Sequence, residues 1–125
     1  MGFLAALHAI VSYVGFIATL YWAGAILFGA GDVVRFPKHY RISYILAMAG
    51  IGLSGIIGLI TTLTGGWAGM IFPWLGLVGV ALHGVLGVKS KKALYAMNTG
   101  SALKLAAVQL VILIVVIGLM GAKPF

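Results

Sequence analysis

The sequence predicts an all-α membrane protein in which four transmembrane helices form one bundle. Hydrophobic residues make up 63% of the 125-residue chain, charged residues make up only 7%, and the mean hydropathy is +1.22. Soluble domains are typically about 45–50% apolar and about 25% charged. A transmembrane helix needs about 20 apolar residues, so four spans use most of the chain and the prediction is a single domain over residues 1–125.

Four apolar stretches define the expected spans. They cover residues 3–31, 43–64, 70–88 and 101–121. The first is long enough to tilt, or to break near the small residues in its second half. The second carries a ridge of small residues spaced by four, Gly50, Ser54 and Gly58, which lets a neighbouring helix approach closely. Gly65 and Gly66 then form a short turn, so we expect the second and third spans to pair as an antiparallel hairpin.

The basic residues predict the topology rather than a nucleic-acid partner. The net charge is +7, and every basic residue except Lys123 lies in or beside the first or third connection. These residues are Arg35, Lys38, Arg41, Lys89, Lys91, Lys92 and Lys104. By the positive-inside rule these loops are cytoplasmic and both termini lie on the outer side. We expect a prokaryotic plasma-membrane protein that contacts the lipid bilayer and other membrane subunits or copies of itself, and no nucleic acid.

Missing residue types exclude several kinds of chemistry. The chain has no cysteine, which excludes disulfides, thiolate catalysis and iron–sulfur ligation. It has no Walker loop, no His-Glu-x-x-His motif and no paired carboxylates. Its one acidic residue, Asp32, ends the first span and is expected to pair with Arg35. No acidic residue inside a span is present to couple transport to protons or cations.

His83 is the strongest candidate for chemistry. It lies in the third span with Gly79 and Gly87 four residues to either side, all on one helix face. An ionisable residue inside a span is a functional hypothesis by default, and a neutral imidazole is a common haem ligand. The glycines would leave room for a flat macrocycle. Alternatively, His83 hydrogen-bonds a threonine or a carbonyl of a neighbouring helix, because burying an unpaired polar ring is costly.

The other histidines, His8 and His39, are further candidates for haem ligation. His8 shares a helix face with Ser12, and is either a second ligand or an interfacial residue. At about 1.5 Å per residue, His8 lies roughly 36 Å from the inner end of its span, whereas His83 lies roughly 9 Å from the basic run after the third span. One haem bridging these two would need a broken or steeply tilted first span. His39 lies in the inner loop, closer in depth to His83, and its alternative is a solvated loop residue.

Landmarks along the whole chain resemble a known family. They are Ala6-Leu7-His8-Ala9-Ile10 in the first span, Leu82-His83-Gly84 before a basic run, Asn98 before the last span, and the ending Lys123-Pro124-Phe125. In this order they resemble the HemJ-like protoporphyrinogen oxidases and the related CopD-like four-helix membrane proteins. The resemblance implies a four-helix fold and a bound b-type haem or porphyrin. It also implies that His8 and His83 match the family's histidines, as possible haem-iron ligands.

The chain departs from the family's pattern at charged positions. The family has an arginine late in the first span, where this chain has small residues around Gly24. It has a lysine early in the third span, where this chain reads Ile71-Phe72-Pro73, and an acid after the asparagine, where this chain has Thr99. These losses leave porphyrinogen-oxidase-like activity an open question, and they favour a haem-binding or electron-transfer protein over a full oxidase.

The main functional hypothesis and two alternatives follow. The main one is a small integral membrane protein that binds haem b or a porphyrin for electron transfer or haem-related redox chemistry, with His83, His8 and His39 as cofactor-binding residues. The first alternative is a non-catalytic accessory subunit of a larger respiratory or oxidase-type membrane complex, suggested by the few intramembrane polar residues and the glycine ridges. The second is an oligomeric channel or carrier with a path lined by Gln109, His83 and the threonines, although a hydrated pathway usually needs more polar positions.

Overall fold

Four long helices account for most of the described chain. The computed structural model describes residues 2–29 and 32–122. The helices are α1 (Phe3–Gly29), α2 (Pro37–Thr64), α3 (Phe72–Tyr95) and α4 (Thr99–Ala122). Each is long and apolar enough to cross a membrane. The predicted all-α class with four candidate spans is therefore confirmed.

Some helix ends differ from those of the predicted apolar stretches, most of all the start of α2 and the end of α3. α2 begins at Pro37, where a proline fits because the first helical N–H groups have no partner within the helix. His39 therefore lies in the first turn of α2 and not in a loop. α3 continues to Tyr95, well past the predicted limit at residue 88, because helical hydrogen bonding persists through the basic run. α1 is continuous to Gly29, and Gly31, the predicted end of the first span, lies outside the described residues.

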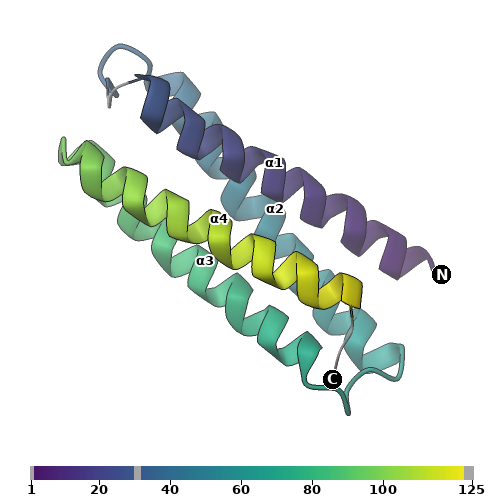
Figure 1. Cartoon of the computed structure of the whole chain (residues 1–125). Coiled ribbons are helices and arrows are strands. Elements are labelled where there is room, and N and C mark those ends of the chain that lie inside the picture. Colours follow the sequence, from purple (N-terminus) through teal and green to yellow (C-terminus); the bar gives the residue numbers. More distant parts are fainter. Residues whose placement is uncertain (1, 30–31, 123–125) are drawn as a thin grey trace.

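The helices form two antiparallel pairs, as Figure 1 shows. α1 packs along α2, α3 packs along α4, and the pairs meet through contacts of α2 with α3 and of α1 with α4. The start of α1 and the end of α4 lie at the same end of the bundle (Figure 1). The connection between α1 and α2 and the connection between α3 and α4, beside which the basic residues gather, lie at the opposite end. We call this opposite end the basic end.

Short turns join the helices within this arrangement. The turn between α2 and α3 contains Gly66 at φ +79°, a conformation that glycine adopts without strain. This agrees with the predicted hairpin. In the connection between α3 and α4, Met97 has φ +63°, and the Asn98 side-chain oxygen accepts a hydrogen bond from the Ser101 backbone N–H at 3.3 Å. The asparagine thus satisfies one of the free N–H groups at the start of α4.

The ridge of small residues on α2 packs against α1, as predicted. A Cβ atom on Gly50 would lie 2.8 Å from the Cα atom of Gly15, so the two backbones touch at this point. Further along, a Cβ atom on Gly58 would lie 2.8 Å from the ring of His8. Side chains larger than glycine at these positions would force the helices apart.

Large buried side chains gather toward the basic end of the bundle. The cluster includes Trp22 and Ile26 of α1, Tyr40 of α2 and Leu94 of α3, each no more than 1% exposed. Trp22 meets the Tyr40 ring edge to face, with the ring centroids 6.4 Å apart. Ala102 of α4 is fully buried against this cluster. Residues from all four helices therefore pack together at this end of the bundle.

Candidate functional site

His83 lies in the centre of the bundle and is hydrogen-bonded to α1. Its side chain is 1% exposed, and its Nε2 atom is 3.0 Å from the Thr19 hydroxyl oxygen. That hydroxyl donates its single hydrogen to the Gly15 carbonyl at 2.8 Å, so it accepts the hydrogen of His83 Nε2. A protonated Nε2 has no lone pair for a metal. The arrangement matches the alternative drawn from the sequence, a histidine paired with a threonine of another helix.

Gln109 binds the same turn of α3 from the α4 side. Its Nε2 atom donates to the backbone carbonyl of His83 at 2.9 Å, and the residue is 1% exposed. Its Oε1 atom is buried and has no hydrogen-bond partner among the described residues. Thr19, His83 and Gln109 form what we call the central polar cluster. It joins α1, α3 and α4 across the middle of the bundle.

Side chains of other helices fill the space beside Gly79 and Gly87, the glycines four residues to either side of His83. A Cβ atom on Gly79 would meet Val116 of α4. A Cβ atom on Gly87 would meet the sulfur of Met48 and, at 2.8 Å, the amide nitrogen of Gln109. The space that the sequence left open for a macrocycle therefore serves helix packing in this structure.

His8 belongs to a second polar cluster, between α1 and α2. Its Nδ1 atom is 3.0 Å from the backbone carbonyl of Ser54, and because a carbonyl only accepts, Nδ1 carries the proton and Nε2 keeps a lone pair. The Ser12 hydroxyl donates to the His8 carbonyl at 2.6 Å, so the Ser54 hydroxyl, 2.5 Å away, donates to Ser12. We call His8, Ser12 and Ser54 the α1–α2 polar cluster.

The two polar clusters lie at different levels of the bundle. His8 and Thr19 are eleven positions apart on the continuous helix α1, which is about 16 Å along its axis. Since Thr19 contacts His83, a similar distance separates His8 from His83 along the bundle. The two histidines therefore lie at different levels and do not share one site, although the separation is shorter than the distances drawn from the predicted span ends implied.

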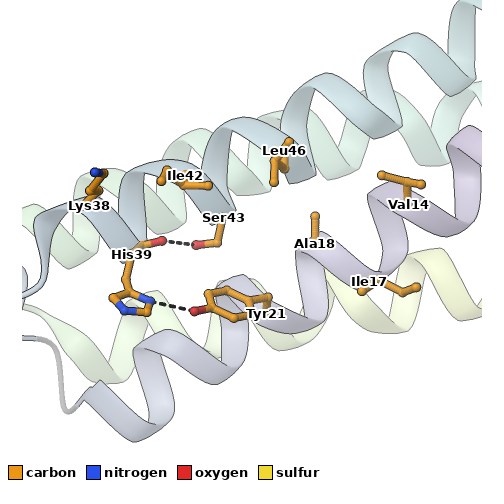
Figure 2. A pocket seen from close by; sticks show the side chains of 9 residues that line it. All are labelled: Val14, Ile17, Ala18, Tyr21, Lys38, His39, Ile42, Ser43 and Leu46. Atoms are coloured by element: carbon orange, nitrogen blue, oxygen red, sulfur yellow. Dashed lines mark hydrogen bonds between the residues drawn. The ribbon is translucent and has the colours of Figure 1, made fainter.

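His39 lies on the outside of the bundle, paired with an aromatic residue of α1. Its Nδ1 atom is 2.6 Å from the Tyr21 hydroxyl, and the two ring planes are 6° apart. Figure 2 shows this pair at one end of a groove between α1 and α2. The pairing with Tyr21 was not expected from the sequence, because the loop predicted for His39 gave it no fixed direction. Helix formation from Pro37 onward aims the ring at α1.

The Asp32 side chain forms a hydrogen bond within its own turn. Its Oδ1 atom accepts a hydrogen bond from the backbone N–H of Arg35 at 2.9 Å. The Arg35 guanidinium lies over the ring of Phe36, 5.3 Å from its centroid. The pairing that the sequence suggested is thus made with the backbone of Arg35 and shapes the connection between α1 and α2.

A haem would need an unprotonated ring nitrogen that faces a flat cavity. His83 fails the second condition, because side chains of other helices fill the space beside its flanking glycines, Gly79 and Gly87. Its Nε2 atom is bound to Thr19, so a neutral ring keeps its lone pair on Nδ1. His8 meets the first, because a metal-bound histidine typically donates its other ring N–H to a carbonyl or carboxylate. Within residues 2–29 and 32–122, no three His, Cys, Asp or Glu side chains gather in a way that could hold a metal ion.

The fold and these clusters define a class: a small protein of four apolar, membrane-compatible helices tied together by buried polar contacts. No protein-family model, curated protein or solved structure matches the chain. Its function is therefore inferred from its own residues and contacts.

Proposed function

We propose that the protein is a non-catalytic integral membrane subunit that supports a larger membrane assembly. The observation that carries the proposal is the engagement of His83, whose ring N–H binds Thr19 and whose carbonyl accepts from Gln109. An ionisable residue inside a span suggests catalysis or transport until its partners account for it. Here the Thr19 hydroxyl of α1 binds the ring, and Gln109 of α4 binds the backbone of the same turn. Interhelical hydrogen bonds of this kind hold helices in register.

The outward faces of the helices suit this role. Phe28 on α1 is 86% exposed, Ile56 on α2 is 60% exposed and Ile114 on α4 is 59% exposed, so apolar side chains surround the bundle. Lipid or apolar helices of another subunit would cover them. In the orientation proposed from the charge distribution, the basic end faces the cytoplasm and both termini lie outside.

Co-purification together with an absorption spectrum tests the proposal. The full chain, expressed at native level and solubilised in mild detergent, should migrate with larger membrane partners at a fixed stoichiometry and show no Soret band. His83→Phe should lower thermal stability without altering the spectrum. A protein that purifies alone, carries a Soret band and loses it in His83→Phe would refute the proposed role.

Haem binding through His8 is the second candidate function. The observation in its favour is the Nδ1–H bond to the Ser54 carbonyl, which leaves Nε2 free to bind iron. A bound haem b would supply one-electron redox chemistry. Expression with added haem should then give a Soret band that His8→Ala removes and His39→Ala keeps. Absence of the band in the unaltered protein would eliminate this candidate.

A further inference from the structure

The groove between α1 and α2 near the basic end has the form of a site for a lipid chain. It is an open groove with a volume of about 510 Å³. Its floor is made of small buried residues, Ala18 at 7% exposed and Ser43 at 2%. Its walls are large apolar side chains, among them Ile17 at 63% exposed and Ile42 at 47%. Small residues between large ones leave a trough along the helix pair, which Figure 2 shows from close by.

Polar groups occur at the His39 end of the trough. Lys38, His39 and Tyr21 line that end, in the first turn of α2 and the facing turn of α1. Val14 and Leu46 line the other end, close to where Gly15 and Gly50 bring the helices together. The groove is therefore apolar at its Val14 end and carries polar groups at its His39 end, which lies beside the connection between α1 and α2.

The charges around the polar end favour an anionic group. Lys38 is exposed and lines this end of the groove. Arg41 is exposed one turn further along α2, outside the groove lining. Asp32, the one acidic residue of the chain, accepts a hydrogen bond from the backbone N–H of Arg35. If Tyr21 donates to His39 Nδ1, then His39 Nε2 carries an N–H group that can donate to an oxyanion.

From these features we propose that the groove binds one anionic phospholipid from the leaflet at the basic end, with its phosphate at Lys38 and His39 and an acyl chain along Ile17 and Ile42. A lipid in that leaflet has its headgroup at the level where α2 begins and its chains beside the apolar walls, so entry needs no reorientation. The inference is independent of the proposed accessory role, because it concerns a lipid and not a protein partner.

Native mass spectrometry of the full chain, with defined lipids added to detergent micelles, tests the proposal. Phosphatidylglycerol should be retained at one molecule per chain, and phosphatidylcholine with the same acyl chains should be retained about tenfold more weakly. Lys38→Gln should weaken retention of phosphatidylglycerol about tenfold, the size expected for losing one charge-assisted contact. Lys104→Gln, which removes an exposed lysine of α4 away from the groove, should change it less than twofold.

A second pair of variants tests the trough itself. Ala18→Leu should fill the floor and abolish retention, whereas Ala107→Leu, at an exposed alanine of α4, should not. Circular dichroism checks that each variant is folded. If Ala18→Leu does not fold, the effect of Lys38→Gln on phosphatidylglycerol retention decides whether the groove binds the lipid. Equal retention of both lipids, or full competition by glycerol phosphate without acyl chains, would overturn the proposal. So would a Soret band from added haemin that is lost in His39→Ala.

Discussion

The contact between Thr19 and His83 allows the most direct test of the central polar cluster. Thr19→Val keeps the shape of the side chain and removes the hydroxyl that accepts the His83 Nε2 hydrogen. Both residues are no more than 1% exposed, so the imidazole N–H is left without a partner and without water. An unpaired buried donor costs about 1–3 kcal/mol in soluble proteins, while interhelical hydrogen bonds in membranes average about 0.6 kcal/mol. We expect a loss of about 1 kcal/mol in the free energy of unfolding.

Reversible unfolding in mixed micelles, followed by circular dichroism, measures this loss. A double-mutant cycle with His83→Phe isolates the pair and should give a coupling energy of at least about 0.5 kcal/mol. The matched control is Thr64→Val, because the exposed Thr64 hydroxyl binds only its own helix, at the Ile60 carbonyl. A coupling energy near zero, or an equal loss in the control, would refute the role assigned to the Thr19 contact.

The same unfolding assay tests three further contacts. Gly87→Val should destabilise the bundle by about 1–3 kcal/mol through overpacking, whereas Gly84→Ala, with no neighbour within 4 Å of its Cβ position, should change stability by less than about 0.5 kcal/mol. Gly50→Val should be similarly destabilising and Gly52→Val should not; equal effects would contradict the close approach of α1. Ser90→Ala should cost about 1 kcal/mol, because its hydroxyl donates to a buried carbonyl of α4; an unchanged stability would show that water replaces this bond.

Composition alone predicted the class of this fold, because helices that span a membrane must be long and apolar. The ends of the helices were not predictable in the same way. Hydropathy falls at the basic run after residue 88, yet α3 continues to Tyr95, because a helix can leave the hydrocarbon without losing its backbone hydrogen bonds. The predicted second span began at residue 43, whereas α2 begins at Pro37; a proline in a first turn is a local signal that hydropathy does not include.

The extension of α3 beyond residue 88 changes the level of His83 relative to the helix ends. Measured from the last helical residue, Tyr95, His83 lies about 18 Å along the axis, and Thr19 lies about 15 Å from Gly29 at the end of α1. The two residues are therefore at nearly the same level, in the middle of the bundle and not near its basic end. Predicting the partner of His83 required the positions of the helix ends, which hydropathy does not reveal. With those ends known, a threonine at matching depth is the expected partner.

The first helix shows how one sequence carries two separate surfaces. His8, Ser12, Gly15 and Thr19 recur at intervals of three and four, so they form one stripe, and this stripe makes the polar and close-packed contacts with α2 and α3. Residues 14, 17, 18 and 21 form a neighbouring stripe that lines the groove. Because the stripes point in different directions, substitutions on the first should change stability, and substitutions on the exposed wall of the second should change lipid retention. A variant of Ile17 that lowers stability as much as Thr19→Val would show that the two surfaces are not separate.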